Sequence, residues 1–218
     1  MNVSAGRDGG DRGRGSLRGV PTWCLGAFAV VWAWSAIGPH HWMDWALENG
    51  LTAVALPAWI WSHRHRNYSQ RAWLQATLFL VLHTIGSHYT YSEVPAGDWA
   101  RETFGWSRNH YDRLVHFAFG LLLLRPLREV VIPDPRPLSI WSLAYTGVAG
   151  VALWSMVYEL IEWFVARTAD PAAGTAYLGT QGDEWDAQKD MALAIGGALL
   201  AALVDLWTDV RARARARP

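Results

Sequence analysis

Long apolar blocks separated by short polar loops constrain this sequence more than any other feature. The blocks lack the steady alternation of apolar and polar residues that marks the amphipathic helices of soluble proteins. Each block is close to the ~20 residues that an α-helix needs to cross the hydrocarbon core of a bilayer. The sequence therefore predicts an all-α fold, a polytopic membrane helical bundle with about six transmembrane helices. Their expected ranges are 20–38, 45–62, 72–91, 112–131, 139–166 and 188–208.

Tryptophan content and net charge indicate which kind of partner, lipid or nucleic acid, the protein has. The chain has 15 tryptophans, and the indole ring favours the headgroup level of a bilayer. The formal net charge of +0 gives no reason to expect nucleic acid as a partner. The composition therefore predicts the lipid bilayer as the main partner of the protein.

The positions of the basic residues predict the orientation, because loops that stay in the cytoplasm retain Lys and Arg. Of the 19 basic residues, all but Arg101, Arg108, Arg113, Arg167 and Lys189 lie in the two tails or in the loops after the second and fourth segments. We therefore expect a bacterial inner (cytoplasmic) membrane protein with both termini cytoplasmic. The predicted domains are a disordered Arg- and Gly-rich tail at 1–19, a six-span transmembrane domain at 20–210 and a basic tail at 211–218.

Ionisable residues inside the predicted spans gather towards their extracytoplasmic ends. A charged side chain at the centre of a membrane helix costs ~2.5–3.5 kcal/mol on insertion scales, so such residues usually face the protein interior and often mark function. Residues three or four apart share one face of a helix, which predicts three polar patches. The patches are Asp112, Arg113 and His116; Glu159 and Glu162; and Asp183, Asp186 and Asp190 if the last helix has begun by Asp183.

Four motifs carry a family resemblance. They are GSHYTYSEVP at 86–95, SRNHYDRLVH at 107–116, YELIEW at 158–163 and LGTQGDEWDAQKDM at 178–191. In this order they resemble the YjdF-like family of bacterial inner-membrane proteins, and the resemblance covers roughly residues 40–205. The family is a domain of unknown function, so the resemblance implies a six-helix membrane protein and no particular activity.

A divalent metal is one explanation for the carboxylates. His116, Glu159, Glu162, Asp186 and Asp190 offer imidazole and carboxylate ligands, which suit Zn, Mn or non-haem Fe. Adjacent buried carboxylates repel one another, so a metal, a proton or Arg113 must neutralise them. The alternative is a buried ion-pair network that fixes how the helices pack, because the spacing matches no strict metal motif.

The leading functional hypothesis is a metal-dependent membrane enzyme that acts on a lipid or envelope substrate at the extracytoplasmic face. The residues expected to act on the substrate are His110, Asp112, Arg113 and His88, with Arg113 and His110 holding an anionic group. A small proton- or ion-coupled transporter is a second hypothesis, because intramembrane carboxylates and histidines also serve as relays. A structural or assembly protein is the third. Enzymatic activity and a homo-oligomeric state both stay open at this point.

Overall fold

The computed structural model describes residues 21–132, 138–168 and 180–215, and in these ranges it is all-helical, as predicted. The elements are α1 (Thr22–Ser35), α2 (Trp42–Arg66), α3 (Gln70–Tyr89), the 3₁₀ turn η1 (Tyr91–Glu93), α4 (Pro95–Phe104), α5 (Tyr111–Val131), α6 (Ile140–Thr168) and α8 (Asp186–Arg215). Six of these helices coincide with the six predicted segments. The predicted tail at 1–19 lies outside the described residues.

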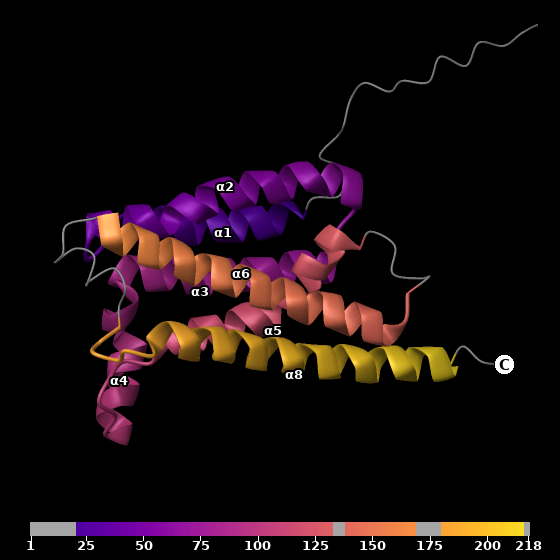
Figure 1. The fold of residues 1–218 in the computed structure, drawn as a ribbon. Helices are drawn as coiled ribbons and strands as arrows, with labels where there is room; N and C mark the ends of the chain where they lie inside the picture. Colours follow the sequence, from indigo (N-terminus) through magenta and orange to yellow (C-terminus); the bar gives the residue numbers. More distant parts are fainter. Residues whose placement is uncertain (1–20, 133–137, 169–179, 216–218) are drawn as a thin grey trace, which may run out of the picture.

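Six helices lie roughly side by side, and α4 projects from one end of the bundle (Figure 1). Contacts fix the directions of the helices. His83, late in α3, contacts the backbone of Glu48, early in α2, whereas Trp73, early in α3, contacts His63, late in α2. The hydroxyl of Tyr111 at the start of α5 reaches the carbonyl of residue 82 in α3. The ends of α3 and α6 therefore meet the starts of α2, α5 and α8 at one end, which we call the polar end.

The helix α4 lies between the expected segments 72–91 and 112–131, where the sequence analysis places no helix. Its boundaries carry ordinary helix signals, because Pro95 occupies the first turn and Gly105 ends the helix with a φ of 67°. The helix is short and polar rather than apolar, so a search for membrane spans passes over it. It connects α3 to α5 at the polar end.

The closest helix pair is α5 and α8, which run in the same direction (Figure 1). A Cβ atom added at Gly120 of α5 would meet the backbone oxygen of Ala194, and one added at Gly197 of α8 would meet the backbone oxygen of Phe117. Ala194 and Ala198 are fully buried in the same contact. Small residues on both helices let the two backbones approach, which is the usual basis of close helix packing in membranes.

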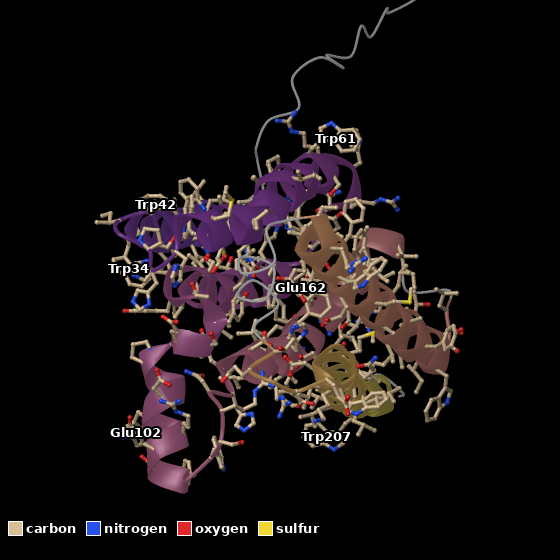
Figure 2. All side chains as sticks on the ribbon, turned by 60° about the vertical axis from the view of Figure 1, so that its left-hand side comes forward. Trp34, Trp42, Trp61, Glu102, Glu162 and Trp207 are labelled. Atoms are coloured by element: carbon tan, nitrogen blue, oxygen red, sulfur yellow. The ribbon has the colours of Figure 1, made fainter. Side chains whose placement is uncertain are left out.

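The outer surface of the bundle is apolar in the manner of a membrane protein. Among the described residues, α6 and residues 186–208 of α8 are each long and apolar enough to cross a bilayer, and α1 is apolar but shorter. Trp42, Trp61 and Trp207 extend from the periphery of the bundle and are more than half exposed (Figure 2). These features agree with a membrane bundle, and the number of six spans stays a prediction.

Candidate functional site

Four side chains from three helices converge at the polar end, and we call them the carboxylate–imidazole cluster. They are Asp112 and His116 of α5, Glu159 of α6 and Asp190 of α8. Ligand atoms of Asp112, His116 and Asp190 all lie within 4.8 Å of one another. His116 Nε2 lies 3.5 Å from Asp112 Oδ1 and 3.7 Å from Glu159 Oε1. Asp112 and His116 reach the same point because residues four apart share a helix face.

Two oxygen atoms of this cluster are buried without a hydrogen-bond partner. They are Oε1 of Glu159 and Oδ1 of Asp190, and no described residue donates a hydrogen bond to either. Asp190 is only 3% exposed. An unsatisfied buried polar group costs about 1–3 kcal/mol, and more when it is charged. The cluster therefore requires a proton or a cation, and His116, 3.7 Å from Glu159 Oε1, is the basic side chain in contact with it among the described residues.

Two further carboxylates adjoin the cluster. Glu48 of α2 is buried, and its Oε2 accepts a hydrogen bond of 2.7 Å from the hydroxyl of Tyr158 on α6. Glu162 lies one helical turn after Glu159, and Figure 2 shows it near the middle of the bundle. Three carboxylates therefore lie around the imidazole of His116, and Glu48 and Glu162 lie on the neighbouring helix segments. Glu48 was not among the residues selected from the sequence, since a lone acidic residue early in a span gives no pairing signal.

An ion-pair network lies directly beside the cluster, at the start of α8. Asp183 Oδ2 lies 2.5 Å from Arg113 Nη2 and 2.6 Å from Lys189 Nζ. Both guanidinium ends of Arg108 contact the carboxylate of Asp186, and Arg113 Nη2 lies 3.3 Å from Asp186 Oδ1. The two arginines thus hold the Asp186 carboxylate between them. We call these five residues the ion-pair network.

Hydrogen bonds between two loops position this network. Asn109 and Gln181 pair reciprocally: the Asn109 amide donates to Gln181 Oε1 at 3.0 Å, and Gln181 Nε2 donates to the Asn109 carbonyl at 2.9 Å. The side chain of Asn109 also accepts from the amide of Tyr111 and donates to the carbonyl of Val94. Asn109 fits because Gly97 has no Cβ, which would otherwise overlap its side chain. The loop that carries Arg108 is therefore tied to the turn that carries Asp183.

Two groups of this loop region have shifted titration behaviour. The hydrogen bond from Lys189, assisted by Arg113, lowers the pKa of Asp183 from 3.8 to about 2. Partial burial, together with the positive charges of Arg113 and Arg108, lowers the pKa of His110. At neutral pH Asp183 is therefore an anion, and His110 is neutral beside the guanidinium of Arg113.

The structure divides the residues selected from the sequence into three groups. Asp112, His116, Glu159 and Asp190 meet in the cluster, with Glu162 adjacent. Arg113 and Asp186 belong to the ion-pair network, and His110 lies beside them, with its Nδ1 3.4 Å from Arg113 Nη1. Asp183 precedes α8 in a turn rather than lying on the helix. His88 lies apart, where its Nδ1 contacts the carbonyl of Ser35 at 3.0 Å and its ring packs on Trp34.

Arg108 is the main site residue that sequence reasoning passed over. It lies in the loop before α5, where a cation reads as solvent-exposed, yet the structure buries it to 6% exposure against Asp186. The only indication in the sequence that Arg108 belongs to the site was its position within the SRNHYDRLVH motif.

The opposite end of the bundle has a charged group of its own. Asp205 of α8 is buried between Arg125 and Arg128 of α5, at 2.9 and 3.0 Å, and Arg71 of α3 lies 3.7 Å away. The neighbouring Glu129 accepts from the amide and the hydroxyl of Ser69, which begins α3. Asp205 Oδ2, like two oxygens of the cluster, has no hydrogen-bond partner among the described residues, but here arginines contact the carboxylate, whereas the cluster has only the imidazole of His116.

Comparison with known proteins places this architecture in a family. Residues 20–210 match the model of a family described as predicted membrane protein (DUF2238). The chain is 33% identical over 172 residues to the inner membrane protein YjdF of Escherichia coli (strain K12), a match that covers 78% of this chain and 81% of YjdF. No solved structure matches the chain. The chain therefore belongs to the DUF2238 family of predicted membrane proteins, as its motifs indicated.

Proposed function

We propose that the protein is a metal-dependent enzyme of the bacterial inner membrane that acts on a lipid or envelope substrate from the extracytoplasmic side. The observation that carries the proposal is the convergence near His116 of buried carboxylate oxygens of Glu159 and Asp190 that accept no hydrogen bond from a described residue. Asp112 completes a set of one imidazole and three carboxylates. Such a donor set suits Zn, Mn or non-haem Fe.

Charge supports a cation at this point rather than a purely structural network. The ion-pair network and the Asp205 group both contain arginines that neutralise their carboxylates. The cluster has several carboxylates around one imidazole and no arginine or lysine in contact with them among the described residues. A divalent ion would offset the repulsion between these oxygens and occupy the two that lack donors.

The surroundings of the cluster suit catalysis on a bound substrate. A metal at this position would polarise a carbonyl or phosphoryl oxygen and lower the pKa of a bound water. Arg113 follows the ligand Asp112 directly in sequence, and His110 lies beside Arg113. These two side chains would orient an anionic group of the substrate next to the metal. His88 contacts Ser35 and Trp34 of α1 rather than the cluster, so we leave it out of the proposed set.

The membrane location of the proposal rests on two observations. The relative from Escherichia coli is named an inner membrane protein. In the sequence, all but five of the 19 basic residues belong to the tails and connections on the side of Arg71, Arg125 and Arg128, opposite to the polar end. The polar end is therefore assigned to the extracytoplasmic face.

Metal content of the purified protein tests the proposal. The protein is purified in detergent, dialysed against Zn, Mn or Fe(II) salts and analysed for metals by elemental analysis. Asp190→Asn and Glu159→Gln should lose metal that the wild type retains, because each removes an unpartnered ligand oxygen. Asp98→Asn, which changes a carboxylate on α4 outside the cluster, is the matched control and should retain it.

Thermal unfolding of the same samples separates the competing functions. Metal that raises the unfolding temperature of the wild type but not of Asp190→Asn supports the centre. If the wild type binds no metal and both variants lose stability, the cluster is a structural network. If it binds no metal and the variants keep their stability, proton or ion flux in proteoliposomes becomes the measurement of choice.

A further inference from the structure

The Asp183 carboxylate occupies a pocket of positive charge that it does not fully neutralise. Its Oδ2 atom contacts Arg113 and Lys189 and lies 3.8 Å from Arg108 Nη1. Its Oδ1 atom accepts the backbone amide of Trp185 at 3.1 Å. Three cations here face only two carboxylates, those of Asp183 and Asp186. Counted over these five residues alone, the network keeps one positive charge in excess, next to the first turn of α8.

The cations of this pocket also have unused donors. The Nε atoms of Arg108 and Arg113 are buried and have no hydrogen-bond partner among the described residues. Arg108 is more than nine-tenths buried, so water does not readily satisfy this donor. A planar guanidinium that holds one carboxylate still presents donors suited to a second oxyanion. The arginines are thus arranged to bind more anionic oxygens than the protein provides.

Asp183 is attached so that it can leave the pocket. It lies in a turn before α8 and is preceded by Gln181 and Gly182, whose φ angles are 50° and 86°. The turn is anchored through Gln181 to Asn109, on the other side of Asp183 from the helix. By contrast, Asp186 lies in the first turn of α8 and is held there by Arg108. Withdrawal of the Asp183 carboxylate would break its ion pairs and its bond from the Trp185 amide, whereas Asp186, whose amide bonds to the Asp183 carbonyl, stays held by Arg108.

We propose that the Asp183 carboxylate is an internal placeholder for a phosphate monoester group of the substrate, which replaces it between Arg108, Arg113 and Lys189. Without Asp183 the pocket carries two positive charges in excess, since only Asp186 remains as an anion. A phosphate monoester carries a charge of about −1.5 to −2 at neutral pH, and its three oxygens match donors on three segments. A carboxylate substrate would leave the excess uncompensated.

The position of the pocket fits the metal-dependent reaction, and the inference rests on that proposed function for its role in catalysis. Asp190 follows Asp186 by one helical turn, about 5.4 Å along α8. Asp112 and Arg113 are neighbours on α5. A phosphate held by the arginines would therefore lie within a few ångströms of the carboxylate–imidazole cluster.

Inorganic phosphate binding tests the placeholder separately from the metal. Detergent-purified, chelator-treated protein is titrated with phosphate by calorimetry, so a missing metal centre does not affect the result. Asp183→Asn should lower the phosphate dissociation constant by about tenfold, which corresponds to about 1.4 kcal/mol. Lys189→Gln should raise it, and Asp98→Asn should leave it unchanged. All of these proteins are compared free of metal, which distinguishes failure of this proposal from failure of the metal proposal, since elemental analysis tests the latter separately.

The proposal is overturned if Asp183→Asn binds phosphate no more tightly than the wild type, or if Lys189→Gln does not weaken binding. If Asp183→Asn unfolds, Asp183→Ser provides the same test with a smaller side chain. The source of the phosphate is resolved in nanodiscs. Weaker phosphate binding in discs that contain phosphatidic acid, but not in discs with phosphatidylglycerol, assigns the monoester to a lipid. Equal binding in both assigns it to a soluble compound.

Discussion

Replacing Gly197 by alanine should separate α5 from α8 and weaken the site that the two helices share. The added Cβ would lie 2.8 Å from the backbone nitrogen of Leu121 and nearer still to the backbone oxygen of Phe117. Ordinary contact begins at 3.4 Å, so relief of the Leu121 overlap alone requires a shift of 0.6 Å, and the closer overlap with Phe117 requires more. Backbone atoms cannot rotate away as a flexible side chain can.

The magnitude follows from a comparison with the neighbouring glycine. A Cβ at Gly196 meets nothing within 4 Å, so Gly196→Ala is a matched control on the same turn of α8. Both variants gain the same helix propensity, up to about 1 kcal/mol relative to glycine. Only Gly197→Ala meets the overpacking cost, typically about 1–3 kcal/mol. We therefore expect Gly197→Ala to be less stable than Gly196→Ala by about 1–3 kcal/mol.

Unfolding by sodium dodecyl sulfate in mixed micelles measures this difference. Gly197→Ala should unfold at a lower mole fraction of the denaturing detergent, while Gly196→Ala should match or exceed the wild type. If the two variants unfold together, close contact between α5 and α8 does not limit stability, and the reasoning is wrong. The same pair also bears on the site, because α5 carries His116 and α8 carries Asp190. Metal affinity should fall in Gly197→Ala alone.

Two further predictions concern single contacts at the polar end. The depressed pKa of Asp183 means that its ion pairs stabilise the turn at 180–185 above pH 3.8 and that this contribution is lost as the pH falls towards about 2. Pepsin cleavage in this turn, followed by mass spectrometry, should therefore increase over that range in the wild type, whereas Asp183→Asn should show no such dependence. Tyr91→Phe should destabilise the protein by about 1–3 kcal/mol, because the hydroxyl donates to His83 Nδ1 at 2.5 Å in a buried environment. Tyr89→Phe, which removes a hydroxyl without a hydrogen bond among the described residues, should unfold at the wild-type temperature.

Hydrophobic blocks were sufficient to locate six helices, because a long apolar run has few alternatives to a helix in a bilayer. They were not sufficient for α4, whose polar residues share no period with a membrane span. Nor did the blocks reveal that α5 and α8 approach each other closely at Gly120 and Gly197. The sequence of an apolar block does not show whether a glycine faces lipid or the backbone of a neighbouring helix. That distinction requires the packed structure.

Helix periodicity grouped Asp112 with His116 and Glu159 with Glu162, since each pair lies within one helix. It could not show which residue from one helix meets which from another. Asp186 and Asp190 share a face of α8, yet one pairs with Arg108 and the other faces His116. That difference depends on the rotation of α8 against α5 and on a loop that connects distant motifs. Both are properties of tertiary packing rather than of local sequence.

The distance between the two charged ends of α8 bears on how the protein sits in a bilayer. The uncharged run between Asp190 and Asp205 covers residues 191–204, and at 1.5 Å per residue it spans only about 21 Å. The hydrocarbon core of a bilayer is about 30 Å thick. Hydrophobic mismatch of this size is relieved by local thinning of the bilayer or by long side chains that reach towards the headgroups. Lys189 and Arg71 have side chains that are about half exposed and lie at opposite ends of the bundle, where they can reach towards the headgroups. A thinned bilayer would bring lipid headgroups down to the level of the polar end, where a membrane-bound substrate would meet the cluster without leaving the lipid.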